Sequence, residues 1–458
     1  MENQISALPD ELVCTILSLL TLKEAVRTSV LSRRWENLWK YFTGNLDFDG
    51  SRAMARMAEQ METMSLSTGR TKYVNWVHQV LIIYQGQDID EFRVCFDLDK
   101  NYAYVIDGWI DFALEKGVRR LELDLREYSH ASRVGQSYTI PLSLLHVSSL
   151  SRLTALCLRK VDMTDEVLAL FLSSSPLIEE LSLVDSRALV NVEIAGALKL
   201  KRLELILCQR LKNVKISAMN LVSFKYYGPA IKNPFENVPR LSQVSIGGCY
   251  SMHVVHAPSV YFSRVLYQLE TLILDLDFTV SMRCFSKLFS VPFPVHLSFL
   301  FFQVYDKSWF PRPTFPEFQN LKYLEIQVSA YADQSILCLC YLTDAAPCLH
   351  KLVLKETEEL AGWRAGKPRD EGRSRRFECL KVVEIAGWIG NTSDTELAVY
   401  LLENAVSLDK MIIDPSYPSR NFWRSWVHKP WKRDLAGPRE RAKLLEAKLP
   451  PGTELVIC

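Results

Sequence analysis

The feature that most constrains the fold of this chain is a short phrase, apolar-x-x-apolar-x-apolar, that returns along most of its length. Twelve copies occur, at gaps of 20 to 35 residues with a mean of about 26, and a returning phrase of this kind is typical of repeat architectures. A weaker thirteenth copy, Ile89-x-x-Phe92-x-Val94, precedes them. The last apolar residues of the twelve copies are Leu123, Leu158, Leu183, Leu205, Tyr226, Ile246, Leu274, Phe302, Ile326, Leu354, Ile385 and Ile413.

The spacing within the phrase predicts a β-strand. Its last two apolar residues are two apart, so on a strand they point to the same face, and the residue between them points to the other. One such strand cannot bury its apolar face alone, whereas parallel strands stacked about 4.8 Å apart share a continuous core. The period lies in the range of leucine-rich repeats. We therefore predict an α/β fold, an irregular leucine-rich-repeat solenoid with a curved parallel sheet, over residues 89–365.

The segments that return from one strand to the next differ in length. The segment from Thr164 to Ser173 has a helix start signal and is predicted to be helical, while the shorter returns leave room only for turns. Cys208 and Cys249 follow their strands at the position where the repeat consensus has Asn or Cys, so we expect both to be buried. The 11 cysteines are scattered without a CxxC pair, which favours free thiols in a reducing compartment.

A different pattern fills residues 1–45, where three short helices are expected. Pro9 suits the first turn of a helix, Thr21 and Glu24 have the spacing of a capping box, and Ser32 is placed to cap a third helix. Three helices in so short a segment cannot bury all of its apolar side chains among themselves. The remaining apolar side chains are expected to form a surface that contacts a partner protein or the repeats.

Residues 8–39 contain Leu8-Pro9-x-x-Leu12, Ile16-Leu17-Ser18 and Thr28-Ser29-Val30-Leu31-Ser32-x-Arg34-Trp35-x-x-Leu38-Trp39. This pattern includes a Pro, an Arg and two Trp as well as apolar residues, and it closely resembles the F-box. Members of that family bind the Skp1 adaptor of an SCF (Skp1–cullin–F-box) ubiquitin ligase. The resemblance implies that the adaptor-binding residues are Leu8, Pro9, Leu12, Ile16 and Leu17.

The F-box variant joined to leucine-rich repeats resembles the large plant F-box/LRR-repeat family, whose C-terminal FBD region is also suggested here. In residues 366–458 we expect a strand ending at Gly387-Trp388, a helix from Glu396 to Asn404, and a last helix followed by a strand at 455–457. This FBD-like region would continue and cap the solenoid. Residues 46–88 are predicted to be a helical connector.

The sequence contains no recognisable motif for catalysis, nucleotide binding or metal binding. No phosphate-binding, nucleotide-binding, nucleophile-elbow or zinc-protease motif occurs, and the cysteines and histidine of the segment 338–350 lack the paired spacing of a zinc site. We therefore expect a non-enzyme with no cofactor and no metal. The net charge of +1 gives no bulk attraction to nucleic acid or anionic membranes, and no apolar run is long enough to span a bilayer. No secretory signal is apparent, so the expected location is the nucleus, the cytoplasm or both.

These observations predict the substrate-recognition subunit of an SCF-type ligase, which reaches the cullin and RING subunits through a Skp1-like adaptor and holds an unknown target protein. Two alternatives stay open: an interaction scaffold working without a cullin, and a receptor that needs a small molecule to bind its target. Target contacts are expected on the concave face of the sheet, from residues that lie between and just after the apolar anchors of the strands. They are Glu122, Asp124, Arg159, Glu204, Tyr227, Glu325, Gln327, Lys355 and Glu384.

Overall fold

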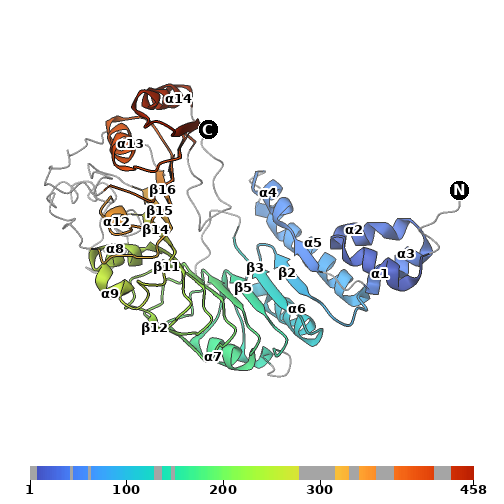
Figure 1. The fold of residues 1–458 in the computed structure, drawn as a ribbon. Helices are drawn as coiled ribbons and strands as arrows, with labels where there is room; N and C mark the ends of the chain where they lie inside the picture. The colour runs from blue at the N-terminus through green and yellow to red at the C-terminus, as the bar shows by residue number, and fades with distance from the viewer. Residues whose placement is uncertain are drawn as a thin grey trace. The chain divides into compact units, whose positions relative to one another are not determined.

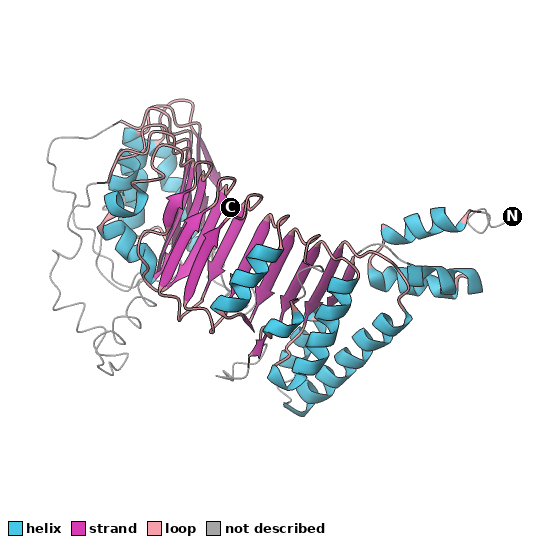
Figure 2. Ribbon diagram, turned by 90° about the horizontal axis from the view of Figure 1, so that it is seen from below, coloured by secondary structure: helices cyan, strands magenta, loops and turns pink. Residues whose placement is uncertain are grey.

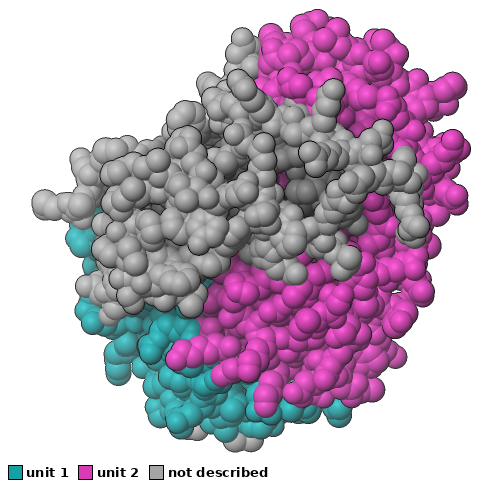
Figure 3. All heavy atoms as spheres, turned by 90° about the vertical axis from the view of Figure 1, so that its left-hand side faces the viewer, with its two compact units in different colours: residues 1–210 teal, residues 211–458 magenta. Residues whose placement is uncertain are grey.

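A computed structural model gives the fold (Figure 1). It divides into two compact units, residues 1–210 and residues 211–458 (Figure 3). The residues that the structure describes are 8–41, 45–59, 63–127, 137–145, 150–277, 315–329, 340–356, 376–416 and 435–458.

The first unit begins with the three predicted helices, α1 (Asp10–Ser18), α2 (Leu22–Arg27) and α3 (Arg33–Leu38). The capping box of α2 is complete, because the Thr21 hydroxyl accepts a hydrogen bond from the Glu24 amide and the Glu24 carboxylate accepts one from the Thr21 amide. The Ser32 hydroxyl caps α3 by accepting from the amide of Trp35 at 3.3 Å. Pro9 stands at the N-cap position, one residue before the helical turn in which we expected it.

The six main strands of the first unit pair in parallel and in chain order, so each repeat adds one strand to the sheet (Figure 2). They are β1 (Leu46–Asp49), β2 (Glu91–Cys95), β3 (Arg120–Asp124), β5 (Ala155–Arg159), β7 (Glu180–Val184) and β9 (Arg202–Ile206). The helices after the bundle are α4 (Ser51–Glu59), α5 (Thr63–Ile83), α6 (Ala103–Glu115) and α7 (Asp165–Ser174). The short strands are β4 (Tyr138–Thr139), β6 (Val161–Asp162) and β8 (Asn191–Ala195).

The description of residues 46–88 as a purely helical connector is wrong at its start. Strand β1 begins there and pairs with β2, so the sheet starts one strand before the first recognised copy of the phrase. Its pattern is too short to show a period, but Leu46 and Phe48 alternate with aspartates as the other strands do, and both are buried. The helical part follows as α4 and α5.

The second unit has the same construction, and its described residues form eight parallel strands in chain order. They are β11 (Ser223–Gly228), β13 (Gln243–Gly248), β14 (Thr271–Asp277), β15 (Tyr323–Ser329), β16 (Lys351–Glu356), β17 (Val382–Ala386), β18 (Lys410–Asp414) and β19 (Glu454–Ile457). Its helices are α8 (Cys249–His256), α9 (Pro258–Phe262), α12 (Cys340–Asp344), α13 (Thr392–Asn404) and α14 (Ala436–Lys443). Single-turn 3₁₀ helices in the two units are Thr28–Val30, Trp39–Tyr41, Lys100–Tyr102, Leu142–Leu144 and Leu444–Lys448.

The C-terminal elements follow the prediction closely. Helix α13 begins four residues before the expected Glu396, because the Asn391 side chain caps it by accepting from the Asp394 amide at 2.8 Å. The last helix and the last strand are both present, as α14 and β19.

The shorter returns hold more structure than the turns we expected. Strands β10 (Asn213–Ser217) and β12 (Phe235–Asn237) pair with each other in parallel, away from the main ladder. Their alternation was visible in the sequence, since Val214 and Ile216 are two apart and both are buried. The copy of the phrase that ends at Phe302 lies outside the described residues.

The buried core confirms the repeat interpretation. Every described last anchor of the phrase is at most 5% exposed, from Leu123 through Ile413. Cys208 is buried as expected, with its thiol 3.6 Å from the Leu183 carbonyl oxygen. Cys249 is buried too, but it is disulfide-bonded, so the expectation of free thiols is wrong at this position.

A substitution series on β9 tests the alternation of the strands. Leu203 and Leu205 are fully buried, and Glu204 between them is only half-buried. We expect Leu205→Ala to lower the free energy of unfolding by about 2–5 kcal/mol, the range for truncating a buried leucine. Glu204→Ala should cost under about 1.5 kcal/mol, the scale of one hydrogen bond. Chemical denaturation of the purified variants measures both, and equal losses for the two would contradict the strand assignment.

Candidate adaptor and target surfaces

Helix α1 has a buried side and, about 100° around the helix axis from it, an exposed apolar side. Val13 and Leu17, one turn apart, are fully buried in the bundle, whereas Leu12 and Ile16, also one turn apart, are 51% and 38% exposed. Pro9 is exposed beside them and Leu8 is half-buried. We call Leu8, Pro9, Leu12 and Ile16 the adaptor face.

The adaptor-binding role expected for Leu17 is not compatible with its burial. Its side chain has no exposed surface, so it packs in the core of the bundle and stabilises the position of α1. The family resemblance pointed to this position because the F-box motif contains it, but a motif contains core residues as well as contact residues. Helical periodicity separates the two, since Leu17 lies one turn from buried Val13.

The start of α1 is held in place by Arg34 of the third helix. The Arg34 guanidinium donates from Nε to the Asp10 carboxylate at 2.7 Å and from Nη2 to the backbone oxygen of Leu8. This explains in physical terms why the motif has an arginine before Trp35. These two hydrogen bonds hold Leu8 and Asp10, the residues on either side of Pro9, at the start of the adaptor face.

Further apolar side chains of the bundle are exposed. Leu19, Val30 and Leu31 are each more than half exposed. Exposed apolar groups are frequent at protein-interaction sites when they form a continuous patch.

The face of the first unit's sheet that turns away from the buried anchors carries charged side chains together with buried Cys95, Val184 and Ile206, and the strand register arranges these residues in rows. We call this side, which carries the residues between the buried anchors, the open face. One row runs through Asp47, Arg93, Glu122, Cys157, Ser182 and Glu204. The next row runs through Asp49, Cys95, Asp124, Arg159, Val184 and Ile206.

Arg93 is the centre of an ion-pair cluster on this face. Its guanidinium lies 3.2 Å from Asp47, 3.4 Å from Asp49 and 3.3 Å from Glu122. Burial works against the charge of Arg93, but the carboxylates, first Glu122 and then Asp47, raise its pKa overall. Glu122, expected to contact a target, is therefore already paired.

A second cluster lies on the same face, two residues earlier on each strand. Arg120 is 3.5 Å from Glu91 and 2.8 Å from Glu180, and Arg202 is 3.0 Å from Glu180. Burial alone would raise the pKa of Glu180, but hydrogen bonds from Arg202 and Arg120 lower it overall. We did not expect these residues on the face. Their position follows from the alternation of side chains along a strand, because each lies two residues before an open-face residue and therefore points to the same face.

The expected target residues of the first unit therefore differ in accessibility. Asp124 is buried and held by Arg126, at 2.8 Å from Nε and 2.5 Å from Nη2, so it is not a free contact. Glu204 accepts a hydrogen bond from the Ser182 hydroxyl at 2.8 Å. Arg159 is half-buried.

In the second unit, three of the expected target residues are buried: Tyr227, Glu325 and Gln327. Glu325 accepts hydrogen bonds from the Tyr323 hydroxyl at 2.7 Å and from Lys355 at 2.5 Å. Glu384 is half-buried and pairs with Lys351 at 2.8 Å. Side chains on neighbouring strands are close enough to form ion pairs across the sheet. Each such pair reduces the solvent exposure of both partners.

Tyr227 is buried for a steric reason. Its ring lies across the strand beside it, over Gly247, where a Cβ would come within 2.3 Å of the ring. Glycine at this position therefore makes room for the tyrosine. With Asp124, four of the nine expected target residues are buried, which leaves Glu122, Arg159, Glu204, Lys355 and Glu384 as partly exposed.

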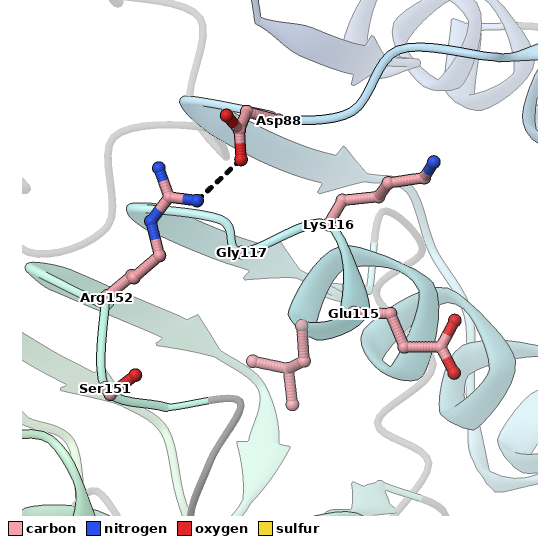
Figure 4. A pocket seen from close by; sticks show the side chains of 7 residues that line it. Asp88, Glu115, Lys116, Gly117, Ser151 and Arg152 are labelled. Carbon is pink, nitrogen blue, oxygen red and sulfur yellow. Dashed lines mark hydrogen bonds and ion pairs between the residues drawn. The ribbon is translucent and has the colours of Figure 1, made fainter.

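A pocket of about 260 Å³ opens beside the start of the strands in the first unit (Figure 4). Asp88 and Arg152 point toward one another across it and form an ion pair of 2.5 Å. The remaining lining residues are Leu114, Glu115, Lys116, Gly117 and Ser151. The main charges of the pocket neutralise each other, and both paired side chains are well exposed, so it has no feature of a buried ligand site.

Within the described ranges, no three His, Cys, Asp or Glu side chains gather as a metal site. Nor does any helix there combine the length and the apolar character needed to cross a bilayer.

The helical bundle and the stacked parallel strands together define an F-box/leucine-rich-repeat protein. Residues 5–45 match the F-box domain, and residues 145–289 and 308–448 match the At1g61320/AtMIF1 LRR domain. The chain therefore belongs to the family of this LRR domain and carries an N-terminal F-box. F-box domains generally bind Skp1-like adaptors, and the combination with repeats suggests a substrate-adaptor role, typically without catalysis.

Curated relatives from Arabidopsis thaliana have the same organisation in their names. F-box/LRR-repeat protein At2g42730 is 28% identical over 50% of this chain and 52% of its own length. F-box/LRR-repeat protein At3g59200 is 31% identical, over 54% and 50% respectively. F-box/FBD/LRR-repeat protein At5g53840 is 32% identical, over 44% and 46%. The chain thus spans about half the length of the curated relatives it matches.

The reactivity of Cys157 toward an alkylating reagent tests whether its thiol is buried as the structure shows. Burial raises its pKa to about 12, and it does the same for Cys95 and Cys208. At pH 8 only about one such thiol in ten thousand is ionised, and the thiolate is the reactive form. We expect iodoacetamide to modify exposed Cys458 in the native protein and to leave these three unmodified until denaturant is added. Peptide mass spectrometry measures this, and labelling of native Cys157 would contradict it.

Proposed function

We propose that this protein is the substrate-recognition subunit of an SCF-type ubiquitin ligase. Its adaptor face docks a Skp1-like adaptor, and the open face of its repeats binds a target protein. The observation that carries the proposal is the exposure of Leu12 and Ile16 on a helix whose other side is fully buried, inside a segment that matches the F-box domain.

The energetic argument for docking is direct. Fully burying a leucine or isoleucine side chain contributes about 1.5–3 kcal/mol, and an adaptor covering α1 would bury what remains exposed of both. Pro9 and the hydrogen bonds from Arg34 limit the conformations of the chain before the helix, so less entropy is lost on binding. The intact bundle supports the face through Leu17 and Val13.

The proposed mechanism is tethering. Ubiquitin transfer takes place on other subunits, with the cullin and RING subunits reached through the adaptor, in the nucleus or the cytoplasm. The receptor raises the effective concentration of the target beside them. It uses no cofactor, no metal, no nucleic acid and no membrane.

We propose that residues 366–458 form an FBD-like region that continues and caps the solenoid. Strands β17, β18 and β19 extend the parallel ladder there, and α13 and α14 belong to the same segment. The FBD in the name of one Arabidopsis relative supports this proposal.

The adaptor face is tested by the double variant Leu12→Asp/Ile16→Asp. Burying two carboxylates without partners is unfavourable, so the variant should lose capture by a recombinant Skp1-like adaptor entirely. Pull-down with purified proteins measures this loss.

A matched control is Leu198→Asp, a leucine that is 66% exposed outside the F-box. It introduces the same charge at an exposed apolar site and should leave capture unchanged. Circular dichroism checks that both variants keep the fold. Adaptor capture by a folded double variant at the wild-type level would refute the proposed docking.

A further inference from the structure

The open face of the first unit carries five arginines, and four of them are ion-paired with carboxylates of the same face. Arg93, Arg120 and Arg202 belong to the two clusters described above, and Arg126 holds Asp124. Arg159 differs: among the described residues no ion pair or hydrogen bond involves its side chain. The guanidinium of Arg159 thus has no partner in the described part of the protein.

The carboxylates on the described strands beside Arg159 are already paired. In register, Arg159 is flanked by Asp124 on one strand and by Val184 on the other. Asp124 is held at both oxygens by Arg126, and Val184 offers no acceptor. Of the carboxylates in the neighbouring row, Glu122 belongs to Arg93 and Glu204 accepts from Ser182.

The position of the guanidinium also matters. Its Nε atom is buried without an acceptor, and an external group cannot reach that atom. The side chain as a whole is half-buried, so the Nη end of the guanidinium remains reachable from solvent. The two Nη groups at this end lie in one plane and suit a two-oxygen acceptor.

We propose that Arg159 is a specificity-determining residue that binds one carboxylate side chain of the target protein. This inference rests on the proposed role of the open face in target binding. A carboxylate fits better than a phosphate because Arg159 offers a single positive charge, which a carboxylate matches and a phosphate of nearly two charges exceeds. The other arginines of the face are already paired and cannot balance the second charge.

The experiment uses the full chain with its Skp1-like adaptor, and immobilised peptides with random flanks. The central residue of the peptides is Asp, Glu, Asn, Gln, phosphoserine or Ala. We expect Asp or Glu to be preferred over Asn or Gln by about tenfold, the scale of one charge-assisted hydrogen-bonded pair. Arg159→Gln should abolish this preference. Arg202→Gln, which removes a paired arginine from the same face, should keep it.

The possible outcomes separate the inference from the proposed function. Peptide selection without an acidic preference, or a preference that survives in folded Arg159→Gln, overturns the inference and leaves target binding intact. A preference for phosphoserine over Glu overturns the choice of a single-charge ligand. No selection at any position overturns both the inference and target binding by the open face, whereas adaptor capture in a parallel pull-down tests the F-box role separately.

Discussion

The parallel hydrogen-bonded ladder, with its strict alternation of side chains, is the constraint on which the rest of this molecule depends. Because successive residues of a strand point to opposite faces, the pairs that bury Leu203 and Leu205 also send Glu204 to the other side. In-register pairing then repeats this choice on every strand of a unit. Core and open face are therefore two results of one pattern, and a slip of one residue would exchange them.

The strand register also determines which polar side chains of the open face remain without an ion-pair partner and could bind another molecule. It places charges of opposite sign on neighbouring strands, and they neutralise one another, as Arg93 does with Asp47 and Glu122. Such pairs stabilise the face only modestly where they are exposed, but they occupy the donors and acceptors. Under the proposal made above, recognition depends on the exception, Arg159, more than on the total charge of the face.

Much of the fold follows from the sequence, because it rests on local rules. The strands follow from the phrase, and the helix starts at Thr21 and Ser32 follow from capping. Strand β1 was missed because four residues are too few to show a period. The accessibility of site residues could not be predicted in the same way, because the burial of Leu17 and Glu325 depends on neighbours distant in sequence.

The account separates two surfaces, an apolar one on the first helix and a polar one on the repeats. Hydrogen exchange of the full chain, with and without a saturating Skp1-like adaptor, tests this separation most directly. The account predicts that the adaptor slows amide exchange in α1 and the adjoining residues of the bundle, with strands β3 to β9 unchanged. Unchanged exchange in α1, or protection centred on the strands, would contradict it.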